Sequence, residues 1–338
     1  MPPRRVPGRA ARRVRRAAGL GDGGSDAAAP EPDLRLTVVT VNTGTTAGLP
    51  HDAPPDDGYG SEQAAVSDAY YGDGLAWPPA IEALRAFFDE VDPDVVVFQE
   101  IFHSADCATI PPEQHAGFVC ETWSEGDPTV AELALGPDYQ VACNLGKPDK
   151  CAAVHRRVGT FRGCEGDLCL DGLDGAQLTG CGGGSRVGRG VIDLVGGGSV
   201  VVVNVHGTSG IEDADEACRV RQVEQVFVDL DGELAANGAI NLVMGDLNTD
   251  PGRLASADPS AARWNDFAGE GLRFHFVTEV GRRVTPTYAT LFNIDHVISD
   301  ALDGSCWAAG VTEGHPAVID AVYFDHVPIV CEVAGDLP

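Results

Sequence analysis

Four short apolar runs constrain the fold of this chain more than any other feature of the sequence. Each run is rich in valine, isoleucine or leucine and ends in polar residues: 34–42, 94–100, 199–206 and 239–248. Runs of this length and composition are typical of strands that are covered on both faces. The ends of such strands are where α/β proteins commonly build their sites. We therefore expect a covered sheet with functional residues at the strand ends.

Two amphipathic segments lie between these runs. Residues 78–91 open with two prolines, which the first helical turn tolerates, and place apolar residues on one face. Residues 213–230 carry acids in the first turn and a stripe of valines, so both segments are predicted helices. Two later strands are predicted at 293–299 and 322–332, and two long glycine-rich loops or insertions at 43–77 and 160–190.

Charge is distributed unevenly along the 338 residues, whose formal net charge is -28. The first 33 residues hold seven arginines against four acids, and we interpret residues 1–33 as a disordered arginine-rich tail and linker. No apolar stretch of a secretory signal follows the arginines, and no run is long enough for a transmembrane helix. The acidic remainder of the chain repels a polyanion unless a local basic patch or metal ions intervene.

The cysteines favour an oxidising compartment. There are ten, an even number, and all lie within residues 107–331, many in glycine-rich sequence. We therefore prefer the interpretation that the cysteines form disulfides, which cross-link irregular backbone. Disulfides in turn predict a location outside the cell or in a periplasm. Free thiols, for which Cys218 in a helical segment is the best candidate, stay open as an alternative. A zinc site is disfavoured because there is no CxxC motif.

Six polar motifs follow one another in chain order at the predicted strand ends: VTVN, VFQE, VNVH, GDLN, NIDH and FDHVP. In this order they resemble the endonuclease/exonuclease/phosphatase superfamily of DNase I-like proteins, over roughly residues 34–334. The resemblance implies a four-layer α/β/β/α sandwich, in which two mixed sheets are flanked by helices, as a catalytic domain at residues 34–335. It also implies a divalent-metal-dependent hydrolase that attacks a phosphoester in line with water.

The resemblance assigns metal ligands as well. Glu100 corresponds to the principal ligand, Asn42 supplies a neutral oxygen, and Asp325 is a further carboxylate near the ion. Hard oxygen ligands of this kind suit Mg²⁺, with Mn²⁺ or Ca²⁺ as alternatives, rather than zinc.

Five residues are the expected catalytic set: His206, Asp246, Asn248, Asp295 and His326. By resemblance, His326 acts on the attacking water or on the developing charge, and Asp295 orients its ring. Asp246 and Asn248 are two apart on a strand, so they address the same substrate group. His206 resembles a phosphate-contacting histidine. Whether Asp246 or His326 is the general base stays open.

One departure from the family pattern concerns substrate binding. Asn293 stands where arginine is frequent, so a cation on the phosphate side is missing there. Arg186 and Arg189, in the glycine-rich segment 182–190, are candidates for contacts to a substrate phosphate, against the alternative of a flexible turn.

The sequence leaves the substrate open. No basic stretch interleaved with aromatic residues is present, which favours a small-molecule or lipid-headgroup phosphoester over nucleic acid. A DNase I-like nuclease is the alternative, and a catalytically silent extracellular binding protein on the same fold is a second one. We expect a monomer.

Overall fold

The computed structural model describes residues 34–46, 59–173, 180–182, 184–230, 232–318 and 323–338. The arginine-rich tail predicted at residues 1–33 lies outside the described residues. Within the described ranges, no helix combines the length and the apolar character needed to cross a membrane.

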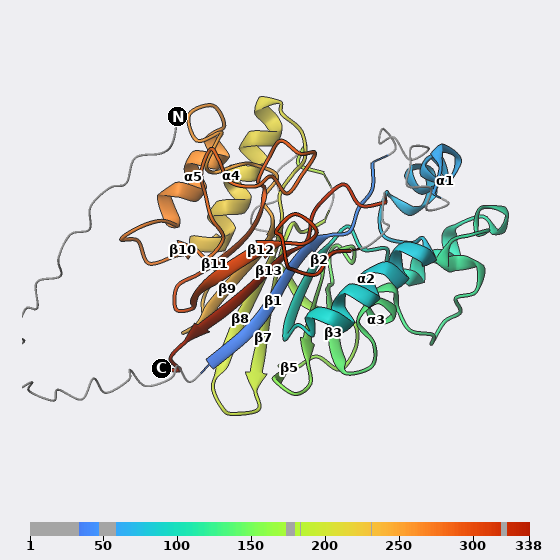
Figure 1. The fold of residues 1–338 in the computed structure, drawn as a ribbon, viewed down its shortest axis with the longest axis horizontal. Coiled ribbons are helices and arrows are strands. Elements are labelled where there is room, and N and C mark those ends of the chain that lie inside the picture. Colours follow the sequence, from blue (N-terminus) through green and yellow to red (C-terminus); the bar gives the residue numbers. More distant parts are fainter. Residues whose placement is uncertain (1–33, 47–58, 174–179, 183, 231, 319–322) are drawn as a thin grey trace, which may run out of the picture. The chain divides into compact units, whose positions relative to one another are not determined.

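Thirteen strands form one hydrogen-bonded sheet (Figure 1). In chain order they are β1 (Leu34–Asn42), β2 (Val95–Gln99), β3 (Tyr139–Asn144), β4 (Cys151–His155), β5 (Gly159–Phe161), β6 (Leu168–Leu173), β7 (Val187–Leu194), β8 (Ser199–His206), β9 (Asn241–Asp246), β10 (His275–Phe276), β11 (Asp295–Ser299), β12 (Asp303–Ala308) and β13 (Ile329–Gly335). Their spatial order is β10-β11-β9-β8-β7-β6-β3-β4-β2-β1-β13-β12, and β5 pairs with β7. The sheet is mixed: β1–β2, β8–β9 and β3–β6 are parallel and the other pairs are antiparallel.

The α/β class is as expected, but the prediction of two separate sheets needs correction. β6 pairs with β3 on one side and with β7 on the other, so the hydrogen bonding continues from one half of the sheet to the other. The β3–β6 register shifts between Cys143 and Asn144, which makes this junction irregular. The result is one large curled sheet. β6 lies within residues 160–190, the segment that the sequence led us to interpret as a loop.

Three apolar cores account for the continuous apolar runs. Alternate residues of a strand point to opposite faces, so Val38 of β1 packs with Val202 and Met244 of the other half of the sheet, while Val39 faces the helix side. This side is covered by α2 (Pro78–Val91) and α3 (Val130–Leu135), whereas α4 (Asp213–Phe227) and α5 (Pro259–Phe267) cover the outer face of the other half of the sheet, to which Val201 and Val243 point (Figure 1). A short helix, α1 (Ser61–Val66), lies in the segment 43–77 that was predicted to be a loop.

One predicted strand is displaced. The expected strand at 322–332 starts only at Ile329, directly after Pro328, which has no backbone N–H to donate to a ladder. Asp325 and His326 therefore precede β13 instead of ending a strand.

All ten cysteines are paired, as the preferred interpretation predicted. The five disulfides are Cys107–Cys120, Cys143–Cys151, Cys164–Cys169, Cys181–Cys218 and Cys306–Cys331, and no cysteine is free. Cys218, the candidate free thiol, lies on α4 and is bonded to Cys181 in the loop before β7. Five disulfides indicate an oxidising environment of the extracellular type.

Candidate active site

Two parallel strand pairs bring four of the expected residues together. The β1–β2 register sets Asn42 opposite Gln99, and Glu100 follows directly, while the β8–β9 register sets His206 opposite Asp246. His206 joins the two pairs, because its Nε2 lies 3.3 Å from Glu100 Oε1 and 3.7 Å from Asp246 Oδ2. The ends of both parallel pairs therefore meet at one place.

The backbone has an unusual conformation at Glu100 and Asn248, which follow the ends of β2 and β9. Both residues have a left-handed φ, +56° for Glu100 and +50° for Asn248, which is costly for a residue with a side chain. Gly44 lies against Glu100 so closely that a Cβ atom there would be 1.8 Å from Glu100 Oε2. This position therefore has room only for glycine while the Glu100 carboxylate holds its place.

Asp246 is the most heavily hydrogen-bonded acid of the site. It is buried, and it accepts hydrogen bonds from Asn42 Nδ2 at 3.1 Å, the Asn248 backbone N–H at 2.7 Å and Asn248 Nδ2 at 3.1 Å. Burial raises the pKa of Asp246 to about 7, although the neighbouring His326 opposes the rise. An acid with such a pKa can accept a proton near neutral pH.

Asp295 and His326 form a buried pair. Asp295 begins β11, whose antiparallel register places it opposite Asp246. His326 Nδ1 lies 2.8 Å from Asp295 Oδ2, and its Nε2 lies 3.8 Å from Asp246 Oδ2. Burial alone would lower the pKa of His326, but Asp295 and Asp246 outweigh it and raise the pKa to about 10. The ring is therefore a cation at neutral pH, with Nε2–H directed toward Asp246.

Asp325 completes the constellation. Its Oδ1 lies 3.9 Å from His326 Nε2, and its Oδ2 accepts a hydrogen bond from Thr46 Oγ1. Burial raises the pKa of Asp325, and it also raises the pKa of Glu100, to about 7, with Asp325 and Asp246 adding to the rise. All eight residues expected from the sequence thus lie within one site.

We call the four acids of this site, Glu100, Asp246, Asp295 and Asp325, the carboxylate cluster. Their chemistry fits a divalent cation. Asp246, Asp295 and His326 offer ligand atoms that lie within 4.8 Å of one another. The Oδ1 atoms of Asp295 and Asp325 are buried without a hydrogen-bond partner among the described residues. A bound cation would satisfy such oxygens and offset the repulsion that raises the pKa of Glu100.

Three basic side chains act on His206, and the sequence analysis recognised only one of them. They are Lys147, Lys150 and Arg186. Burial lowers the pKa of one of them, Lys150, to about 7. Asp149 bridges the lysines, at 2.7 Å from Lys150 Nζ and 3.3 Å from Lys147 Nζ. Burial, and then Lys150 and Arg186, hold the pKa of His206 well below its usual range, so its ring is neutral. One signal in the sequence could have pointed to the two lysines: Lys147 and Lys150 are the only lysines in the chain.

Two other candidates from the sequence lie elsewhere. Arg189 pairs with the exposed carboxylate of Asp171 and does not contact the constellation. Asn293, at the position where a cation was expected, donates to the Glu279 carbonyl oxygen and is buried.

A pocket of about 400 Å³ opens beside Glu100. Its lining includes Tyr70, Phe102, His103, Asp106 and Lys147. The Glu100 side chain is 31% exposed, whereas those of His206 and Asp246 are at most 4% exposed. Glu100 is thus the acid of the site that lines this pocket.

The sequence matches the family model described as "Endonuclease/Exonuclease/phosphatase family" over residues 42–327. The chain belongs to this family. The match extends from Asn42 to the residue after His326, so it contains all eight residues of the site. No curated protein matches the sequence significantly.

Solved structures with low sequence identity share the fold. An endonuclease/exonuclease/phosphatase family protein from Bacteroides thetaiotaomicron is 15% identical, with a TM-score of 0.51 over 90% of this chain and 96% of that one. The human Nocturnin catalytic domain with bound sulfate anion is 14% identical, with a TM-score of 0.51 over 89% and 94%. A family protein from Beutenbergia cavernae is 17% identical, with a TM-score of 0.50 over 89% and 72%. At these identities the likeness concerns the fold alone.

Proposed function

We propose that this protein is a divalent-metal-dependent hydrolase of phosphoesters that acts by in-line attack of water. The observation that carries the proposal is the buried Asp295–His326 pair, whose free ring nitrogen is directed at Asp246 within the carboxylate cluster. Membership of a family named for nucleases and phosphatases supports the same chemistry.

The proposed metal ligands are Asn42, Glu100 and Asp325, with Mg²⁺ as the preferred ion and Mn²⁺ or Ca²⁺ as alternatives. Asp295 Oδ2 and His326 Nδ1 already bond to each other, so the carboxylate oxygen of this pair that remains available to an ion is Asp295 Oδ1. When bound, the ion would neutralise negative charge on the phosphate group.

The protein's own groups divide the remaining work. We propose that Asp246, with its pKa near 7, accepts the proton of the attacking water, which Asn248 helps to orient. His326, held as a cation by Asp295, donates from Nε2 to the charge that develops on the phosphate oxygens. Neutral His206 offers Nε2–H to the same region. These roles favour Asp246 over His326 as the general base.

We further propose that the curled sheet is a joined form of the four-layer sandwich, because its two halves share one core between two helical layers. Residues 34–335 would then be one catalytic domain. We also propose that the protein acts as a monomer.

The proposed substrate is a small-molecule or lipid-headgroup phosphoester. The pocket beside Glu100 has a volume suited to a leaving group of limited size, and two carboxylates, Asp106 and Asp149, line it together with Glu100. Such a wall disfavours a polyanionic leaving group. Nuclease activity is the alternative, because the basic side chains near His206 provide a local site for phosphate.

The test is hydrolysis of three substrate sets by the purified protein with Mg²⁺: supercoiled plasmid at low salt, phospholipids, and sugar phosphates. The controls are EDTA, Asp246→Ala, and Asp171→Ala as a matched change of an exposed acid. We expect release of product from a small ester that is lost with EDTA and with Asp246→Ala only. Plasmid nicking with the same controls would favour the nuclease. No hydrolysis, together with no Mg²⁺-dependent thermal shift, would leave a silent binding protein.

A further inference from the structure

Among the described arginines that are not exposed, Arg186 is the one without an ion pair. The others that are half-buried or buried form ion pairs with acids: Arg189, Arg219, Arg221, Arg253 and Arg263. The described arginines without an ion pair are exposed, apart from Arg186, which is half-buried. A guanidinium held away from water with no acid within ion-pair distance is expensive, and a bound anion would offset that cost.

Arg186 is placed next to the catalytic constellation. Its Nη1 donates to the Gly207 carbonyl oxygen at 3.2 Å, and Asn248 Nδ2 donates to the same oxygen at 3.0 Å. The Arg186 carbonyl in turn accepts the His206 backbone N–H at 3.0 Å. The Arg186 guanidinium and the Asn248 side chain thus donate to the same carbonyl oxygen, and Asn248 also donates to Asp246. Its Nε is buried without a partner among the described residues.

The loop that carries Arg186 is fixed at two points. Cys181, five residues earlier, is bonded to Cys218 on α4, and both cysteines are buried. Ser185 Oγ, next to Arg186, lies 2.6 Å from the Leu173 carbonyl oxygen and 2.8 Å from that of Val187. These anchors hold the start of β7 against α4 and β6, and so restrict where the guanidinium can lie.

We propose that Arg186 contacts the non-bridging phosphate oxygens of the substrate, and that the Cys181–Cys218 disulfide positions it for this contact. The inference rests on the proposed phosphoesterase function and deepens it. Arg186 supplies the phosphate-side cation that the Asn293 position lacks. An arginine offers several N–H donors in a fork that matches two phosphate oxygens, whereas an ammonium acts as a point charge.

Arg189 provides a matched control. It lies on β7, three residues after Arg186, which precedes that strand. There it bonds Asp171 Oδ2 at 2.7 Å and the Leu234 carbonyl oxygen at 2.9 Å. Arg189→Gln therefore removes the same charge from a nearby position without touching the site.

The experiment measures two quantities on wild type, Arg186→Gln, Arg186→Lys and Arg189→Gln: the affinity for inorganic phosphate, by calorimetry with Mg²⁺, and kcat/KM on the best substrate found. We expect Arg186→Gln to lose about 10-fold or more in both, Arg186→Lys to lose less, and Arg189→Gln to stay within about twofold of wild type. Thermal unfolding checks that each variant is folded, and Arg186→Lys keeps the test valid if the glutamine variant is not.

The disulfide is tested in the same way with Cys181→Ser/Cys218→Ser. The matched control is Cys164→Ser/Cys169→Ser, which opens a disulfide between β6 and the loop that precedes it. Loss of phosphate affinity in the first double variant only is the expected result.

The possible outcomes separate this inference from the proposed function. Equal phosphate affinity in Arg186→Gln and Arg189→Gln would overturn the role of Arg186, even if the wild type hydrolyses esters. Phosphate binding that depends on Arg186 in a protein that hydrolyses no ester would support the anion site and contradict the proposed function.

Discussion

Replacement of Glu100 by glutamine should stabilise the metal-free protein above neutral pH. The environment raises the pKa of Glu100 from 4.5 to about 7, chiefly by burial and further through Asp325 and Asp246. Between pH 4.5 and pH 7 the folded state binds more protons than the unfolded state. The free energy of unfolding therefore falls as the pH rises through this range. Glutamine carries no charge and escapes this loss, and it keeps an oxygen within reach of His206.

The size of the effect follows from the shift. A change from 4.5 to about 7 corresponds to about 3 kcal/mol at full strength. Water and salt screen a side chain that is 31% exposed, so we expect about 1–2 kcal/mol. The gain should be complete above pH 7 and absent below pH 4.5. Mg²⁺ should reverse the order, because it stabilises only the protein that binds it.

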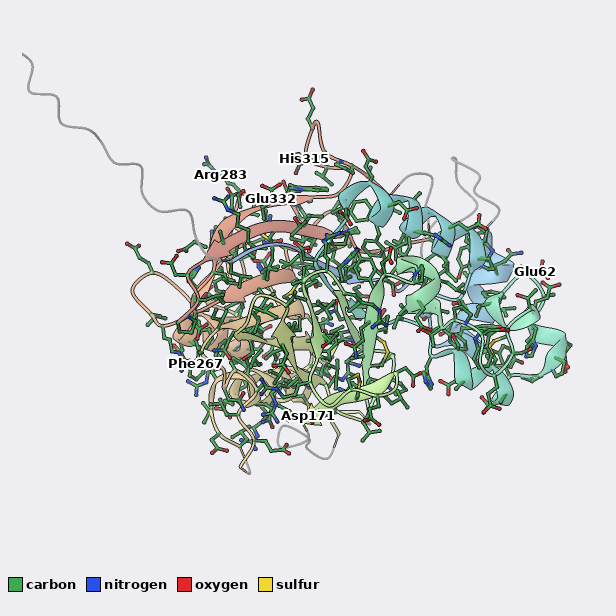
Figure 2. All side chains as sticks on the ribbon, turned by 90° about the horizontal axis from the view of Figure 1, so that it is seen from below. Glu62, Asp171, Phe267, Arg283, His315 and Glu332 are labelled. Atoms are coloured by element: carbon green, nitrogen blue, oxygen red, sulfur yellow. A yellow bond between two sulfur atoms is a disulfide. The ribbon has the colours of Figure 1, made fainter. Side chains whose placement is uncertain are left out.

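The assay is denaturant unfolding of both proteins at pH 4.5 and pH 8 in EDTA, repeated at pH 8 with Mg²⁺. Glu62→Gln, a change at the exposed acid labelled in Figure 2, serves as the control and should alter stability little at either pH. The reasoning is refuted if Glu100→Gln is less stable than wild type at pH 8 in EDTA. It is equally refuted if the difference between the two proteins is the same at both pH values.

Three further results are expected. Asp295→Asn should lower kcat by about 10²–10⁴-fold, because His326 loses the carboxylate that orients and charges it; a loss below threefold would contradict this role. Gly44→Ala should abolish the Mg²⁺-dependent thermal shift, since its Cβ displaces the Glu100 carboxylate, whereas Gly166→Ala, with open space around it, should keep the shift. The unreduced protein, once denatured, should react with no thiol reagent, and any labelled cysteine would disprove the pairing of all ten.

The part of the site that lies on parallel strands could be predicted from the sequence because its geometry is local. A covered strand followed at once by a polar residue places that residue at the sheet edge, whatever the rest of the chain does. Asn42 and Glu100 follow from one such pair, and His206 and Asp246 from the other. The register of each strand pair then places the two polar residues side by side.

The rest depended on contacts between distant segments. β6 has the sequence LCLDGL, with exposed residues and a glycine, so it lacks the apolar run that marks the other strands. Only its pairing with β3 and β7 makes it the junction of the curled sheet. In the same way, Cys218 has the pattern of a buried helical thiol, and its bond to Cys181 depends on how α4 meets the loop before β7.

The charges of the site show why net charge was a poor guide to its substrate. The chain is strongly acidic overall, yet Lys147, Lys150 and Arg186 lie near enough to His206 to lower its pKa, within reach of the carboxylate cluster. Fields near a site are set by such local groups, because salt screens charges more than about 10 Å away. A single phosphate at this site would meet basic side chains as well as a bound metal ion. A long polyanion would meet the acidic remainder of the surface as well, and this difference favours a small ester.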